Sequence, residues 1–242
     1  IIFSSLGAIS AILLLVFKDS ILGFVASIQV SLLGIAKEGD WIEMPTYNAD
    51  GIILDINLSS IRVQNFDKTI STIPTYALVS EPVKNWEGME MANCRRIKRS
   101  IFIDISSIKP CSEELINKLS QVNLLSNYIK AQSKNIDVYN KAQTNNNIEI
   151  NQRNLSNIGV FRKYIENYIQ SHPNINQTST ILIRQLSPSE YGLPIEIYCF
   201  TSTTDWNEYE AIQSDIFDHL FSILTQFELK PFQLEIIKKI NT

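Results

Sequence analysis

The sequence predicts a membrane-spanning helix, then a small all-β domain, then an α+β domain with a ferredoxin-like order of elements. Three observations support this fold class. Residues 1–36 contain only two charged side chains, Lys18 and Asp19, although charged residues make up 19% of the chain. Residues 37–83 contain several short runs of alternating apolar residues, and residues 101–236 combine strand and helix patterns.

The first apolar segment, residues 1–17, carries no charge. A helix of this length covers roughly 25 Å, close to the minimum for the hydrocarbon core of a bilayer. Lys18 and Asp19 interrupt the apolar run, and a second uncharged run, residues 21–36, follows. Charges are costly inside a bilayer and tolerated at its surface. We therefore expect one spanning helix, a break or kink at Lys18 and Asp19, and a second helix along the membrane boundary.

Small residues are concentrated in this helix. One stripe runs through Ser4, Ala8, Ala11 and Leu15, and a neighbouring stripe runs through Gly7, Ser10 and Leu14. Small side chains at helical spacing let neighbouring membrane helices approach closely. Around a shared axis, the first stripe would face the axis and the second would contact the next copy. The stripes alone favour the simpler interpretation, an ordinary packed transmembrane helix.

Two further expectations concern the flanks of this segment. The chain begins with Ile1, and its apolar segment lacks the basic flank and cleavage site of a signal peptide. We therefore expect further membrane spans upstream. Gly23 is either a flexible point of the hinge or a site of close packing.

The middle of the chain, residues 37–85, predicts a small and strongly bent β domain. A strand is expected at Trp41–Met44, a second over residues 52–58, a third from Ile61 to Asn65, and a fourth that ends at Pro74. So many strands in so few residues indicate a barrel or a sandwich. Such a domain is too small to bury both sheet faces, so packing against other copies is expected.

The motifs of this segment resemble those of the small-conductance mechanosensitive channel (MscS-like) superfamily. They are a Gly-acid-aromatic turn, a G-x-I-x-x-I strand, a turn ending in Ile-Pro, and a V-x-N-W exit, found here at Gly39-Asp40-Trp41, Gly51-Ile53-Ile56, Asp67-Ile73-Pro74 and Val83-Asn85-Trp86. An apolar helix precedes them, as in the family. The basic cluster at Arg95, Arg96, Lys98 and Arg99 resembles the miniconductance branch.

This resemblance implies a homo-oligomeric ion channel, a heptamer, opened by membrane tension in a bacterial inner membrane. The residues after about 36 would be cytoplasmic, with an Sm-like barrel and a vestibule wall. Membrane lipids, permeating ions and small osmolytes released on hypoosmotic shock would be its partners. The expected sites are pore-lining Ser4, Ala8, Ala11 and Leu15, helix-packing Gly7 and Ser10, and a kink at Lys18, Asp19 and Gly23.

The sequence departs from the family pattern at several positions. Thr75 follows the Ile-Pro pair where the family commonly has Asn. Lys18 and Asp19 stand at the kink, which is often Gln-Gly. The upper of two apolar constriction positions corresponds to Ala11, whereas Leu15 matches the lower one. These differences bear on the tightness of the closed gate and on its hinge.

The third region, residues 86–242, predicts the α+β domain. The expected elements are a strand at residues 101–105, a helix from Ser112, a polar and partly ordered insertion near 123–157, a helix at 158–169, strands at 180–186 and 195–202, a long helix capped by Asp205, and a last strand at 232–236. This order matches a ferredoxin-like layer. The fold alone decides no function, because it hosts many. The insertion is typical of the longer miniconductance type.

Other functions lack support in the sequence. The three cysteines are far apart and the two histidines have no partner motif, so neither a metal site, a cofactor nor an enzyme is expected. The pI of about 5.3 argues against nucleic acid. For the basic cluster Arg95–Arg99, structural ion pairs are favoured over lipid or ion contact. The alternative function is a non-conducting, membrane-anchored scaffold or sensor with a cytoplasmic partner-binding domain.

Overall fold

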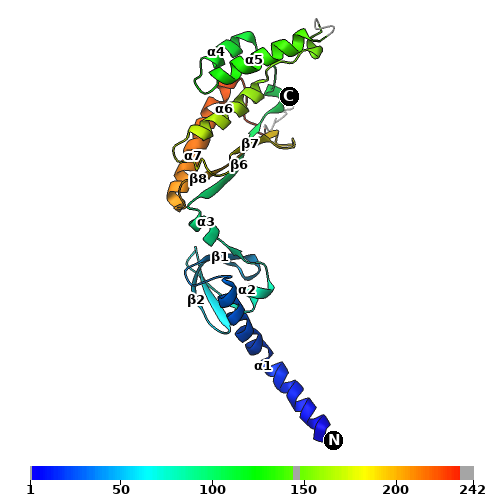
Figure 1. Ribbon diagram of the computed structural model, residues 1–242, viewed down its shortest axis with the longest axis vertical. Coiled ribbons are helices and arrows are strands. Elements are labelled where there is room, and N and C mark those ends of the chain that lie inside the picture. The colour runs from blue at the N-terminus through cyan, green and yellow to red at the C-terminus, as the bar shows by residue number, and fades with distance from the viewer. Residues whose placement is uncertain (1, 144–147, 235–242) are drawn as a thin grey trace, which may run out of the picture. The chain divides into compact units, whose positions relative to one another are not determined.

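The computed structural model describes residues 2–143 and 148–234, with the side chains of its first helix described at Gly7 and from Ile9 onward. The chain divides into two compact units, Ile1–Ala92 and Asn93–Thr242 (Figure 1). The boundary follows α3 (Glu87–Met91) rather than the expected residue 85. The reason is that Trp86 N donates a 2.9 Å hydrogen bond to the Trp41 carbonyl, which ties the start of α3 to the first unit.

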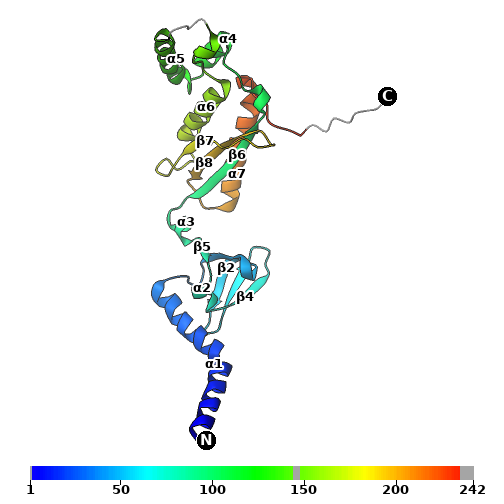
Figure 2. The same ribbon diagram turned by 90° about the vertical axis from the view of Figure 1, so that its right-hand side faces the viewer.

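The first unit begins with one continuous helix, α1 (Ile2–Leu33). The helix is not broken at Lys18 and Asp19, because both residues lie inside it with exposed side chains, and the kink expected there stays a prediction. Charged side chains leave the backbone hydrogen bonds intact, and the helix contains no proline to remove one. Figure 2 shows that α1 nevertheless changes direction along its length. The helix ends at Leu33, and the next residue, Gly34, has a left-handed φ of +61°.

The β domain is a five-stranded antiparallel sheet in the order β4-β3-β2-β1-β5. Its elements are β1 (Trp41–Met44), η1 (Pro45–Tyr47), β2 (Ala49–Ile56), β3 (Ser60–Asn65), β4 (Ile70–Pro74), α2 (Ala77–Ser80) and β5 (Lys84–Asn85). The predicted strands are thus confirmed. Ile42, Ile61 and Ile73, which lie on β1, β3 and β4, are fully buried. At Gly51 a Cβ atom would lie 2.0 Å from the Gln64 carbonyl oxygen, so this position accepts no side chain.

The two ends of the family-like motif meet in the β domain. The Trp41 ring stacks on the Trp86 ring with centroids 4.6 Å apart, and its Nε1 donates to Asp50 Oδ1 at 2.8 Å. Asp40 is buried and accepts a 2.8 Å hydrogen bond from Asn85 Nδ2. The departure at Thr75 is accommodated, because its hydroxyl donates to the Asn57 carbonyl at 2.7 Å. The motif residues therefore hold the beginning and the end of the β domain together.

The second unit is an α+β layer. Its elements are β6 (Arg95–Ile103), η2 (Ile105–Ser107), α4 (Glu113–Ser120), α5 (Ser126–Lys141), η3 (Glu149–Asn151), α6 (Asn157–Ser171), β7 (Leu182–Gln185), β8 (Leu193–Thr201), α7 (Trp206–Ile223) and η4 (Leu224–Phe227). The antiparallel sheet has the order β6-β8-β7. Side chains of α6 and α7 share one core with the sheet, and α4 and α5 lie at one end of α6 (Figure 2).

The structure adds to one expectation for this unit and departs from another. The insertion near 123–157 contains the helix α5, although its polar composition predicts only partial order. Leu125 and Ile129 are buried in the domain core, and Ile136 packs against it, so one face of α5 has apolar partners. The predicted last strand is absent from the described residues 232–234, and a single bridge joins Ile103 to Pro231 just before them. Residues 235–236 lie outside the described residues.

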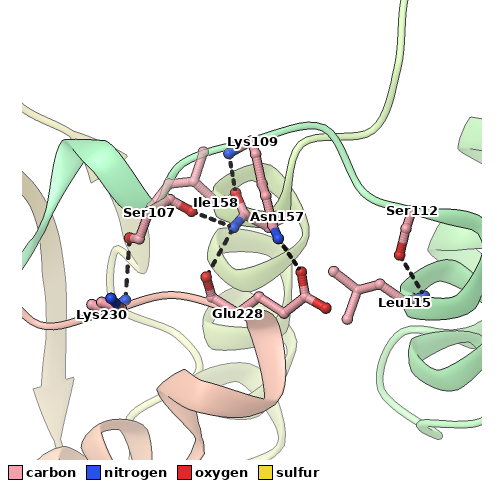
Figure 3. Close-up of polar contacts among 8 residues, drawn as sticks. All are labelled: Ser107, Lys109, Ser112, Leu115, Asn157, Ile158, Glu228 and Lys230. Carbon is pink, nitrogen blue, oxygen red and sulfur yellow. Dashed lines mark hydrogen bonds and ion pairs between the residues drawn. The ribbon is translucent and has the colours of Figure 1, made fainter.

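A buried asparagine joins three segments of the second unit (Figure 3). Asn157 is fully buried at the start of α6. Its Oδ1 accepts hydrogen bonds from the amides of Lys109, at 3.0 Å, and Ile158, at 2.9 Å. Its Nδ2 donates to the carbonyl oxygens of Ser107, at 2.9 Å, and Glu228, at 3.4 Å. All the hydrogen-bond donors and acceptors of this side-chain amide are therefore satisfied inside the protein.

Candidate pore helix and its anchor on the β domain

The first half of α1 exposes apolar side chains on all sides. Ile12, Leu13, Leu14, Leu15, Val16 and Phe17 are each between 52% and 75% exposed. Within α1, residues Ile9–Leu33 are long and apolar enough to cross a membrane. An apolar surface of this size on a single chain marks contact with lipid or with other protein.

The predicted stripe residues occupy this exposed half. Ala11 and Leu15 lie one helical turn apart and are exposed, as are Gly7 and Ser10. Ser4 and Ala8 lie on α1, but their side chains are outside the described part of the chain. A single chain exposes every side of this helical segment. The pore-lining and packing roles of the two stripes therefore stay predictions.

The second half of α1 packs on the β domain along one stripe. Gly23, Ala26 and Val30 are buried, and they follow one another at steps of three and four residues, so they share a helix face. Val30 belongs to the same core as Ile42 and Leu78. The β domain thus anchors one half of α1. The sequence contains a signal for this anchor, because Gly23, Ala26 and Val30 continue the pattern of small and apolar residues at helical spacing.

The structure supports the close-packing interpretation of Gly23. A Cβ atom at this position would lie 2.6 Å from the Leu58 carbonyl oxygen and 3.4 Å from the Ser59 Cα. Glycine is needed here because the helix backbone approaches the turn between β2 and β3. Gly23 is therefore a close-packing residue.

A cavity of about 700 Å³ lies beside this anchor, within the first unit. Ser27 and Ser31 of α1 line one wall, and Leu58 lines another. Lys37 and Glu87, which form an ion pair, stand at the cavity as well. The hydrogen bond and charge of Glu87 raise the pKa of the Lys37 amine above its ordinary value. The cavity therefore has both an apolar and a charged border.

The basic cluster forms the first half of β6 and packs on aromatic rings. The Arg95 guanidinium lies 4.5 Å from the Trp206 ring centroid and 4.6 Å from that of Tyr209, and Arg99 lies 4.7 Å from Phe217. Among the residues that the structure describes, Arg96, Lys98 and Arg99 form no ion pair. Cation–π contacts therefore help to position Arg95 and Arg99.

Side chains that could bind a metal or act as nucleophiles are scattered across the described residues. Within residues 2–143 and 148–234, no group of three or more His, Cys, Asp or Glu side chains could hold a metal ion. The described cysteines Cys94, Cys111 and Cys199 are all unpaired thiols. Burial raises the pKa of the Cys199 thiol to about 12, so this thiol is not a nucleophile at neutral pH.

Two family models match the chain. The model described as mechanosensitive ion channel, beta-domain, matches residues 19–88. The model described as mechanosensitive ion channel MscS, C-terminal, matches residues 152–230. The chain belongs to the MscS-like superfamily. The first model covers the anchored half of α1 and the β domain, and residues 89–151 of this MscS-like chain lie outside both models.

Curated relatives agree with this membership. The low conductance mechanosensitive channel YnaI of Escherichia coli is 22% identical over 207 residues, which cover 86% of this chain and 46% of YnaI. An MscS family protein of Helicobacter pylori is 22% identical over 232 residues, which cover 94% of this chain and 33% of that protein. The MscS-like chain therefore spans less than half the length of these relatives. The comparisons indicate no catalytic family.

Solved structures show the same fold. The structure of Arabidopsis thaliana MSL1 matches 96% of this chain and 66% of its own chain, with a TM-score of 0.64 and 11% identity. The closed-state crystal structure of Helicobacter pylori MscS matches 99% of this chain and 74% of its own, with a TM-score of 0.60 and 15% identity. The predicted fold class, an apolar helix followed by a β domain and an α+β domain, is confirmed.

Proposed function

We propose that copies of this MscS-like chain, seven if it follows the resemblance, form an ion channel that membrane tension opens. The channel would lie in a bacterial inner membrane, with the residues after about 36 in the cytoplasm. It would release ions and small osmolytes during hypoosmotic shock. The observation that carries the proposal is α1, whose first half exposes apolar side chains on all sides and whose second half is anchored on the superfamily's β domain.

The exposed half of α1 has two kinds of apolar surface, the stripes of small residues and the bulkier side chains. Other copies of the helix would cover the small-residue stripes, because Gly7 and Ser10 permit close approach. Membrane lipids would cover the bulkier side chains. A ring of Leu15 side chains would then form a narrow apolar neck, with Ala11 one turn above it. Apolar necks of this kind exclude water and stop ions when closed.

Opening would move the exposed half of α1 relative to its anchored half. The stripe Gly23, Ala26 and Val30 holds the second half on the β domain. Lateral tension favours the arrangement that occupies more membrane area, so the first halves would separate and widen the neck. The change of helix direction in Figure 2 supports a bending point between the two halves. Lys18 and Asp19 would mark that point at the membrane boundary.

Patch-clamp recording of the complete protein tests this function. The host should be a bacterial strain without its own mechanosensitive channels, and surface expression in the inner membrane should be verified. Suction on the patch should open discrete, tension-dependent currents, and the strain should survive a hypoosmotic downshift that kills the empty host. Protein present in the membrane without suction-activated currents would refute the channel and favour the non-conducting scaffold or sensor.

A further inference from the structure

A small polar pocket lies in the second unit, between α5 and the start of α6. Its volume is about 230 Å³. Tyr128, Gln132 and Asn135 of α5 line one side, and Arg153, Asn154 and Arg162 line the other. The α5 side belongs to residues 89–151, which neither family model covers. The pocket is therefore formed jointly by a superfamily element and a segment outside the family models.

The pocket is positively charged. Its lining contains two arginines and no carboxylate. In the part of the chain that the structure describes, neither Arg153 nor Arg162 forms an ion pair. The Arg153 guanidinium packs over the Tyr139 ring, 4.8 Å from its centroid, which restricts the guanidinium without neutralising it. Two cations without a carboxylate favour an anionic occupant.

The remaining lining is rich in hydrogen-bond donors. Gln132, Asn135 and Asn154 each present a side-chain amide, and Tyr128 presents a hydroxyl. The first amides of α6 are already used, since Gly159 N donates to Ser156 Oγ at 3.2 Å. Selectivity would thus come from side chains, mainly from the guanidinium groups, which bind phosphate oxygens in pairs.

The walls of the pocket are held in place before any ligand binds. Arg153 N donates to Asn140 Oδ1 at 2.9 Å, and Asn140 Nδ2 donates back to the Arg153 carbonyl at 3.0 Å. At the other wall, the buried Asn157 fixes the first turn of α6. A pre-organised site loses less conformational entropy on binding than a mobile one does.

We propose that this pocket binds a small soluble anion that carries a phosphate group, independently of the channel function. The volume lies below the roughly 300–1,000 Å³ typical of sites for drug-sized ligands. The occupant is therefore inorganic phosphate or a phosphorylated compound of a few carbon atoms, rather than a nucleotide. Because the arginines lie on the wall opposite Gln132 and Asn135 of α5, the bound anion would join α5 to the start of α6.

Binding can be measured on the complete protein in detergent by calorimetry and thermal unfolding, at constant ionic strength. The probes are inorganic phosphate and glycerol 3-phosphate, with chloride as the reference anion. We expect saturable binding and a higher unfolding temperature with the phosphate probes. Arg153→Gln and Arg162→Gln should each weaken binding roughly tenfold or more, since each removes a charge-assisted contact. Lys134→Gln removes the same charge from an exposed position of α5 outside the lining, and it should leave binding unchanged.

Three results would overturn the assignment. One is the absence of saturable binding of either phosphate probe to the unmodified protein. Another is equal weakening by Lys134→Gln, which would indicate general charge attraction. The third is a response to short-chain phosphatidic acid without a response to the soluble probes, which would assign the pocket to a lipid headgroup. Unfolding temperatures in chloride should match among the variants, which separates lost binding from lost folding.

Discussion

Gly23 of α1 lies against the backbone of Leu58, so closely that a Cβ atom on Gly23 would be 2.6 Å from the Leu58 carbonyl oxygen. This contact joins the membrane helix to the turn between β2 and β3. Carbonyl oxygens of the backbone cannot move aside as a flexible side chain can. The distance between α1 and the β domain is therefore set by the absence of a side chain at position 23.

Gly23→Val should separate α1 from this turn and destabilise the first unit by about 1–3 kcal/mol, the usual cost of overpacking. Thermal unfolding of the purified protein measures the loss. Gly88→Val is the matched control, because a Cβ at Gly88 meets nothing within 4 Å. Equal stability of the two variants would show that the anchor tolerates a larger separation.

Leu15→Ser should make the proposed neck wettable and lower the tension at which the channel opens. Leu13→Ser is the control, because two residues rotate the helix by roughly 200° and place Leu13 on the opposite side. Both leucines are exposed in the single chain, so neither variant disturbs a folded core. Patch-clamp thresholds decide the matter. Unchanged threshold and conductance in Leu15→Ser would mean that Leu15 is not the gate.

Asn157→Ala should destabilise the second unit by about 2–3 kcal/mol. The substitution leaves the amide of Lys109 and the carbonyl of Ser107 without their side-chain partner in a partly buried place. Asn117→Ala, at an exposed position of α4, should change stability little. Chemical unfolding measured by circular dichroism compares the two, and a loss of less than about 0.5 kcal/mol in Asn157→Ala would contradict the expectation.

Acid should destabilise the β domain. The hydrogen bond from Arg62 lowers the pKa of Asp55, and the Thr69 hydroxyl and amide lower that of Asp67. A carboxyl whose pKa is lower in the folded state stabilises it above the unfolded pKa, near 4, and this contribution disappears as the pH falls through the folded pKa. Stability should therefore be nearly constant from about pH 7 to pH 5 and should decrease below about pH 4.

Unfolding followed by tryptophan fluorescence across this pH range tests the assignment. The Asp55→Asn and Asp67→Asn double variant should lose less stability between about pH 5 and pH 3 than the unmodified protein does. Parallel curves for the two proteins would show that other carboxyl groups cause the acid sensitivity. Lys134→Gln, far from both carboxyl groups in sequence, checks that a charge change elsewhere has no such effect.

Local patterns predicted most of the elements. The strands at Trp41–Met44 and Ser60–Asn65 were found because alternation of apolar residues depends only on the two faces of a strand. The cap at Asp205 was found for a similar reason, since its carboxylate bonds the amide of Glu208 only three residues away. Helix α5 was not predicted from the sequence, because it has few apolar residues. These residues stabilise the helix only through contacts with the domain core, which the sequence pattern does not show.

The candidate site was only partly predictable. The sequence placed Ala11 and Leu15 on one stripe, but it suggested a break at Lys18 and Asp19 that the structure lacks. Charge predicts where a helix meets the membrane surface, whereas a break requires the loss of backbone hydrogen bonds. The sequence suggested ion pairs for the arginines of β6 but did not show their aromatic partners. The rings that contact Arg95 and Arg99 lie on α7, more than a hundred residues away in the chain.

The sequence by itself determined the order of elements, the superfamily resemblance and the apolar character of α1. These properties depend on residue type and on spacing along the chain. Only the tertiary structure decided that Gly23 is a packing residue and that Arg153 and Arg162 share a pocket with α5. These contacts join different elements of the chain. They depend on how the elements pack in space, which no local sequence pattern encodes.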